Sequence, residues 1–148
     1  YENGTYKVED KLLSKINEHF AAYYATEDEC RVAISDAYKN DSRLIDPHTT
    51  VAYVSLKKYR MKTFDNHKSV ILSTASPYKF ADSVLSSIDD IGEGQLDGFE
   101  CMDKLYDVTK EPIPYNLIEL KNKKIRFDTT LSYDSCKDFV IKNIKGLL

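Results

Sequence analysis

The sequence predicts an α/β protein that is mostly helical. Apolar residues recur at helical spacing in several segments, for example at Val8, Leu12, Ile16 and Phe20. One short apolar run, residues 70–73, has apolar side chains on both faces, which is typical of a buried strand in a parallel sheet. No second strand of comparable quality is present, so we expect the sheet to be incomplete within these 148 residues.

Helix-start signals divide the first half of the chain into three predicted helices. The first covers residues 8–25. The second begins at Thr26, where Glu29 lies at the capping-box position. The third begins at Asp46-Pro47, because Asp is a good N-cap and Pro suits the first helical position. Its expected inner stripe consists of four residues, Val51, Ala52, Ser55 and Tyr59.

Further helices are predicted after the strand. Ser76-Pro77 is another cap followed by proline and opens a helix that carries Val84 and Leu85. Later helices are expected near 98–108, after Pro114, and near 133–145. The length of 148 residues suits one domain with a single core. Within it we distinguish a helical segment (1–62), a strand–helix unit (63–95) and a C-terminal helical segment (96–148).

Composition excludes several classes of function. The net charge is −3, and basic residues cluster only between Lys121 and Arg126, a run that is usually a solvated surface. An acidic chain without a wide basic face argues against a nucleic-acid partner. No apolar run approaches the ~20 residues that cross a bilayer, so we expect no membrane partner.

The cysteines and histidines match no known disulfide or metal-binding signature. The cysteines, Cys30, Cys101 and Cys136, are odd in number and far apart, which fits neither a disulfide framework nor a zinc site. Cys30 and Cys136 fall on apolar helix faces, so we expect both in the core. No two histidines have metal-ligand spacing, and no metal is predicted. A reducing, cytoplasmic location fits these residues.

Two segments have patterns that suggest chemistry. Residues 44–52, Leu-Ile-Asp-Pro-His-Thr-Thr-Val-Ala, place His48 in the first turn of the third helix; the alternative is simply a well-capped helix. Residues 72–80, Leu-Ser-Thr-Ala-Ser-Pro-Tyr-Lys-Phe, place the hydroxyls of Ser73 and Thr74 at the carboxyl end of the predicted strand. Ligands bind there in open α/β sheets. The alternative is a plain strand-to-helix turn.

Together, in this order, the two segments resemble the threonine synthase family. That family reads close to Ile-Asp-Pro-His-Thr-Ala-Val-Ala near its C-terminus, and later has a strand ending in Ser-Thr-Ala before a Pro-x-Lys-Phe helix start. The matching residues here are 45–52 and 73–80. The chain departs from the family at Ser76, where many members carry His, at Tyr78, where a small residue is usual, and at Thr50, where Ala is common.

The resemblance implies a C-terminal fragment of a pyridoxal-phosphate enzyme with the tryptophan-synthase-like fold (fold type II). Such enzymes convert O-phospho-L-homoserine and water into L-threonine and phosphate. Their Schiff-base lysine and phosphate-binding loop lie upstream, so we expect no catalytic residue here, no activity and no specific cofactor binding by the chain alone. Thr74 matches the hydroxyl that faces the cofactor's pyridine nitrogen. Ser73 is the weaker candidate, and His48 is a possible neighbour of the site.

Two other interpretations remain open. The chain is alternatively part of another pyridoxal-phosphate lyase of the same fold, or a freestanding helical interaction module whose strand pairs with a partner. In either case an apolar strand with open edges is association-prone. We therefore expect residues 70–73 to mediate self-association of the isolated chain.

Overall fold

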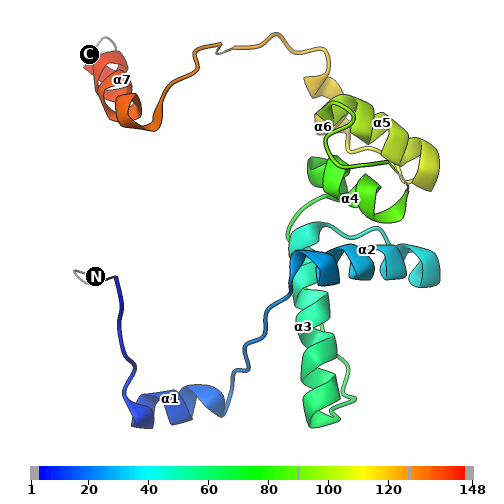
Figure 1. Ribbon diagram of the computed structural model, residues 1–148, viewed down its shortest axis with the longest axis vertical. Helices are drawn as coiled ribbons and strands as arrows, with labels where there is room; N and C mark the ends of the chain where they lie inside the picture. Colours follow the sequence, from blue (N-terminus) through cyan, green and yellow to red (C-terminus); the bar gives the residue numbers. More distant parts are fainter. Residues whose placement is uncertain (1–3, 90, 127, 146–148) are drawn as a thin grey trace.

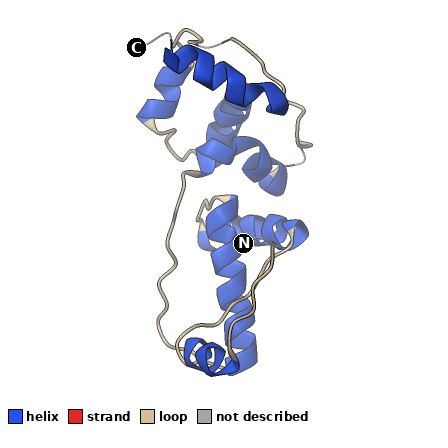
Figure 2. Cartoon of the chain, turned by 90° about the vertical axis from the view of Figure 1, so that its left-hand side faces the viewer, coloured by secondary structure: helices blue, strands red, loops and turns tan. Residues whose placement is uncertain are grey.

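A computed structural model describes residues 4–89, 91–126 and 128–145, and its course is shown in Figure 1. This part of the chain forms helices joined by loops, without a strand (Figure 2). None of its helices is both long and apolar enough for a bilayer crossing. The elements are α1 (Asp10–Asn17), α2 (Glu27–Asp41), α3 (Pro47–Thr63), the 3₁₀ helix η1 (Pro77–Phe80), α4 (Ala81–Ile88), α5 (Gly98–Thr109), α6 (Tyr115–Leu120) and α7 (Tyr133–Lys145).

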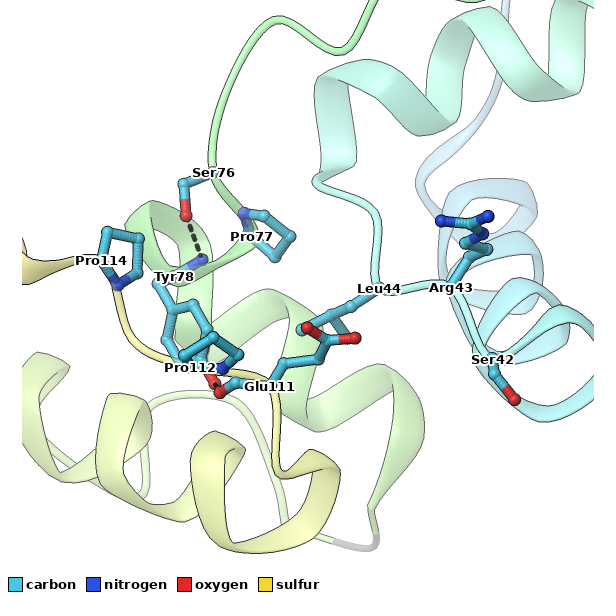
Figure 3. A pocket seen from close by; sticks show the side chains of 9 residues that line it. All are labelled: Ser42, Arg43, Leu44, Ser76, Pro77, Tyr78, Glu111, Pro112 and Pro114. Carbon is cyan, nitrogen blue, oxygen red and sulfur yellow. Dashed lines mark hydrogen bonds between the residues drawn. The ribbon is translucent and has the colours of Figure 1, made fainter.

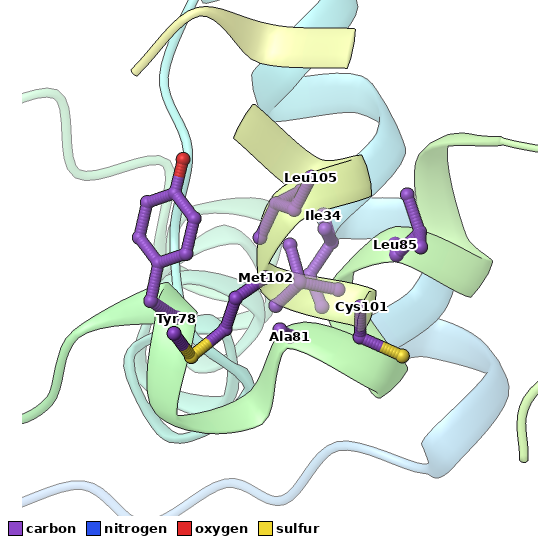
Figure 4. Close-up of a cluster of buried hydrophobic side chains, with 8 residues drawn as sticks. Ile34, Tyr78, Ala81, Leu85, Cys101, Met102 and Leu105 are labelled. Atoms are coloured by element: carbon purple, nitrogen blue, oxygen red, sulfur yellow. The ribbon is translucent and has the colours of Figure 1, made fainter. Parts of the chain in front are cut away.

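The core lies where α2, α4 and α5 meet, with η1 at its edge. Figure 4 shows the side chains from these elements pointing toward one another. Val84 and Leu105 are fully buried, and Leu85 and Ile34 are almost so. The segments 1–62, 63–95 and 96–148 therefore each contribute side chains to one common core. Its members are Ile34, Tyr78, Ala81, Val84, Leu85, Cys101, Met102 and Leu105.

Local capping signals determine where the core helices begin. The predicted capping box at Thr26 and Glu29 is confirmed, since each side chain accepts the other residue's backbone N–H. A second capping box, Asp97 with Glu100, opens α5. The sequence itself carries this Asp-x-x-Glu signal at the start of the helix predicted near 98–108.

Helix α3 begins as predicted, but a different face is buried. Asp46 is the N-cap and Pro47 is the first helical residue. The buried residues of the helix are Thr49, Thr50 and Val54. Val51 and Ala52, which we had placed on the inner stripe, are exposed. The apolar pattern is ambiguous here because the inward face near the helix start is made of threonines.

Helices α1 and α7 lie away from the core (Figure 1). The helix predicted over 8–25 covers only Asp10–Asn17, and none of its residues is buried. The expectation that Cys136 is a core residue is wrong: it is exposed on α7, whereas Cys30 is buried. Both helices have apolar faces that no other described helix covers, and an uncovered face contributes little to stability.

Residues 70–73 form no strand in this structure, contrary to our prediction of a buried one. They run as an extended loop between α3 and η1, and the side chains of Val70 and Leu72 are 89% and 75% exposed. A strand requires a hydrogen-bonded neighbour, and no described segment lies beside this one as a strand. The apolar run therefore shows a surface that is suited to burial but is not buried here.

Candidate functional site

The start of α3 and the segment that precedes η1 meet, although they are 25 residues apart in sequence. The backbone N–H of Thr74 donates to the hydroxyl oxygen of Thr49, at an N···O distance of 3.4 Å. The ring of His48 lies against that of Phe80, with 4.7 Å between ring centroids. The two sequence segments that carry the family resemblance are thus neighbours in space.

Asp46 organises the first turn of α3 from a buried position. It is 1% exposed, and its Oδ1 accepts the backbone N–H of His48 at 2.9 Å and that of Thr49 at 3.3 Å. Its Oδ2 accepts the hydroxyl of Thr49, and its carbonyl oxygen accepts the hydroxyl of Thr50 at 2.8 Å. A carboxylate at a helix N-terminus is stabilised by the helix dipole and by these free donors. The turn is therefore closely tied together around one buried charge.

His48 lies beside this turn but faces solvent. Its side chain is 62% exposed, and its Nδ1 is 3.4 Å from Oδ1 of Asp46. Contact with Phe80 positions the imidazole beside the last residue of η1. The structure therefore brings His48 close to the segment of Thr74 without burying it.

Ser73 and Thr74 are both exposed, and they lie in the extended loop. In the described part of the chain, Thr74 is held only through its backbone N–H, and no hydrogen bond involves its hydroxyl. The side chain of Thr74 is thus accessible while its main chain is anchored. Ser76, two residues later, is the N-cap of η1, because its hydroxyl accepts the N–H of Tyr78 at 3.3 Å.

A polar pocket of about 260 Å³ opens beside η1 (Figure 3). Its walls come from residues 42–44 and 76–78 and from Glu111, Pro112 and Pro114 of the 111–114 loop. The hydroxyl of Tyr78 donates to the carbonyl oxygen of Glu111 at 2.5 Å, and burial raises the pKa of this phenol. Nothing in the sequence pattern had indicated this pocket. The structure explains the unusual Tyr78: its ring fills the core edge and its hydroxyl ties η1 to the 111–114 loop.

Other candidate chemistry is not supported by the described residues. Burial raises the pKa of the Cys30 and Cys101 thiols, which disfavours the reactive thiolate. In the part of the chain that the structure describes, no three His, Cys, Asp or Glu side chains are grouped to hold a metal ion.

Several known proteins are similar in sequence to this chain. No family model matches the chain. It is 32% identical over 83 residues to human threonine synthase-like 1, covering 56% of this chain and 11% of that protein. It is 28% identical over 134 residues to threonine synthase of Saccharomyces cerevisiae, covering 84% of this chain and 23% of that protein. It is 36% identical over 92 residues to threonine synthase of Schizosaccharomyces pombe, covering 60% of this chain and 18% of that protein.

One solved structure of a threonine synthase is also similar to this chain. The pyridoxal-phosphate-bound threonine synthase from Brucella melitensis matches with a TM-score of 0.50 and 27% identity, over 78% of this chain and 24% of that one. The chain thus spans between about a tenth and a quarter of the length of these relatives. Sequence and structure agree with the resemblance noted in the two motif segments: this chain is similar to threonine synthases and to threonine synthase-like 1.

Proposed function

We propose that this chain is the C-terminal part of a threonine synthase, a pyridoxal-phosphate-dependent lyase of threonine biosynthesis. The reaction is the conversion of O-phospho-L-homoserine and water to L-threonine and phosphate. The observation that carries the proposal is the contact between the two motif segments. It anchors the backbone of Thr74 on Thr49 and leaves the Thr74 hydroxyl exposed.

Within that enzyme we assign Thr74 to the pyridine nitrogen of pyridoxal phosphate. A free hydroxyl fits this position, because it donates one hydrogen bond to a neutral ring nitrogen. A carboxylate there would instead favour the protonated ring. The cofactor, when bound, supplies the electron sink for the reaction. Thr74 then orients the ring and keeps its nitrogen neutral. Ser73, its exposed neighbour, is the second candidate for the same contact.

The proposal assigns the catalytic lysine and the phosphate-binding loop to a part of the longer chain outside these 148 residues. By resemblance, the Schiff-base lysine and the phosphate-binding loop lie upstream of the matching residues, so the 148 residues alone should neither bind the cofactor specifically nor act on substrate. Gel filtration after incubation with pyridoxal phosphate should leave no stoichiometric visible absorbance, although surface lysines can form nonspecific imines. A retained band that maps to one lysine would contradict this assignment of the catalytic lysine.

The assignment is tested by substitution in the complete enzyme. Thr74→Val keeps the shape of the side chain but removes the hydroxyl, which leaves the ring nitrogen unpaired at a cost of about 1–3 kcal/mol. Cofactor affinity or turnover should fall roughly 5- to 150-fold. Thr74→Ser, the matched control, should retain much more of both. Thr74→Asp should change the visible absorbance of the bound cofactor. If Thr74→Val equals the wild type, Ser73 is the next residue to test.

Residues 70–73 are proposed to join a sheet in the longer chain and to self-associate when that sheet is absent. Val70 and Leu72 are exposed apolar residues in the loop between α3 and η1. Analytical ultracentrifugation of the 148-residue chain should show oligomers that Leu72→Lys reduces. Val32→Lys, at a position 61% exposed on α2, is the matched control and should not reduce them. A wild-type chain that stays monomeric at high concentration would exclude self-association.

The alternative functions predict different products. One of the matched relatives is named threonine synthase-like 1, which states a likeness and not a reaction. For another lyase of this fold, the complete enzyme would release phosphate or another leaving group without forming threonine. For a freestanding interaction module, no cofactor-dependent reaction would occur at all. Measuring phosphate and threonine from O-phospho-L-homoserine together separates these cases.

We place the protein in the cytoplasm, in keeping with its unpaired cysteines.

A further inference from the structure

We infer that Thr49 is a positioning residue for Thr74: its hydroxyl, oriented by buried Asp46, fixes the backbone from which the Thr74 side chain projects. The role toward a cofactor rests on the proposed function. The hydrogen-bonded link itself does not, since it is a property of this chain alone.

The link has a fixed direction. The Thr49 hydroxyl has a single proton, and that proton is donated to Oδ2 of Asp46. The oxygen therefore remains available as an acceptor, and the N–H of Thr74 is the donor that it meets at 3.4 Å. A hydroxyl that donates to a carboxylate is polarised, which makes its oxygen a better acceptor. The distance is at the long end of the hydrogen-bonding range.

Asp46 provides a firm anchor for this hydroxyl. It is 1% exposed, and Oδ1 is already engaged by the N–H groups of His48 and Thr49. These bonds belong to the first turn of a helix of 17 residues, so the carboxylate cannot rotate without uncapping α3. The position of the Thr49 oxygen is therefore set by the helix and not by the loop.

The loop depends on this anchor because it makes few other hydrogen bonds. Before it, Arg60 donates to the hydroxyl of Ser69, and after it, Ser76 caps η1. Within the described residues 70–75, one hydrogen bond is present, and it is the one that the backbone N–H of Thr74 donates to Thr49. The hydroxyl of Thr74 is thus held in place by one acceptor on α3, and loss of that acceptor should free the loop.

The first test measures the link in the 148-residue chain by amide hydrogen exchange with NMR detection. Thr49→Val should increase exchange at the Thr74 amide roughly 3- to 10-fold, the effect of removing one hydrogen bond. Thr49→Ser, which keeps the hydroxyl, should leave it near the wild-type rate. Thr50→Val is the matched control, since Thr50 is fully buried in the same turn and its hydroxyl bonds Asp46 but not Thr74.

Amides of the core helices report whether each variant is folded, and Thr49→Ala replaces Thr49→Val if the latter does not fold. An unchanged Thr74 amide in a folded Thr49→Val or Thr49→Ala chain would overturn the inference. An equal increase in Thr50→Val would overturn it as well, because the effect would then belong to the turn as a whole.

The second test concerns the role of the link in the complete enzyme. Thr49→Val should lower pyridoxal-phosphate affinity or turnover in the direction that Thr74→Val does, and Thr49→Ser should restore whichever property falls. In a double-mutant cycle, Thr49→Val should add little once Thr74 is already Val. Additive losses would overturn the positioning role. If Thr74→Val itself has no effect while the exchange result holds, the cofactor assignment fails and the link between Thr49 and Thr74 remains.

Discussion

The central helices and the terminal helices of this chain have similar sequence patterns but different surroundings. Helices α2, α4 and α5 bury their apolar faces against one another. Helices α1 and α7 carry comparable apolar faces that remain exposed (Figure 1). Helical periodicity therefore identifies which face of a helix is apolar, but it does not identify what covers that face.

Side-chain capping distinguishes α2, α3 and α5 from α1. Helices α2 and α5 begin with capping boxes, and α3 begins with the buried Asp46. The N-cap residue of α1 is Glu9, whose side chain makes no capping hydrogen bond. Local and tertiary signals thus coincide in α2, α3 and α5, a consistency that favours folding. The terminal helix α1 has neither.

The largest effect expected from this comparison is the cost of removing a core side chain. Leu105 is fully buried, so Leu105→Ala should lower the free energy of unfolding by about 2–5 kcal/mol. Ile16→Ala in α1, at a position 38% exposed, should change it by less than about 0.5 kcal/mol. Urea unfolding followed by circular dichroism measures both. A comparable loss for Ile16→Ala would show that α1 packs on the core in solution.

The next effect concerns the helix caps. Asp46→Ala removes the acceptor of three donors and should lower the free energy of unfolding by about 1–3 kcal/mol. Asp46→Asn keeps one acceptor oxygen and should cost less. Glu9→Ala, the corresponding change in α1, should be close to neutral because Glu9 makes no capping bond. Equal losses at the two caps, measured by thermal unfolding, would contradict the comparison.

A smaller effect of opposite sign is expected at the end of α5. Lys110 occupies the left-handed region, with φ of 57°, which costs a residue with a Cβ about 1–2 kcal/mol. Lys110→Gly should raise the free energy of unfolding by about 0.5–1 kcal/mol, part of the gain being offset by the flexibility of Gly in the unfolded chain. Lys104→Gly, inside the same helix, should lower it by a similar amount. A loss at both positions would contradict this geometry.

The smallest effect is a local dependence on pH. The backbone N–H and side chain of His67, with the hydroxyl of Tyr59, hold the pKa of Asp65 at about 2, below the value of 3.8 for a free Asp. Because the folded-state pKa is depressed, the contribution to stability is complete above about pH 4 and is lost as the pH falls toward 2. Titration of the Asp65 carboxyl carbon by NMR measures the pKa. Asp65→Asn should remove the dependence, and an ordinary pKa would exclude the interaction.

The accuracy of the sequence predictions follows the same division. Capping chemistry is local, and the starts of α2 and α3 were predicted at Thr26 and Asp46. The strand predicted over 70–73 and the predicted burial of Cys136 were both wrong. Burial depends on a partner segment, and no described segment covers either site. The hydrogen bond from Thr74 to Thr49 joins residues 25 apart, and no periodicity or spacing indicates such a contact.

The distribution of the cysteines makes the chain suitable for site-selective labelling. Cys30 and Cys101 are buried, and burial raises the pKa of both thiols, whereas Cys136 is exposed on α7. A maleimide fluorophore or spin label should therefore attach at one position of the native chain without mutagenesis. That position lies on a terminal helix whose apolar face is uncovered. A change in the label's mobility or emission would then report directly when a second protein segment covers α7.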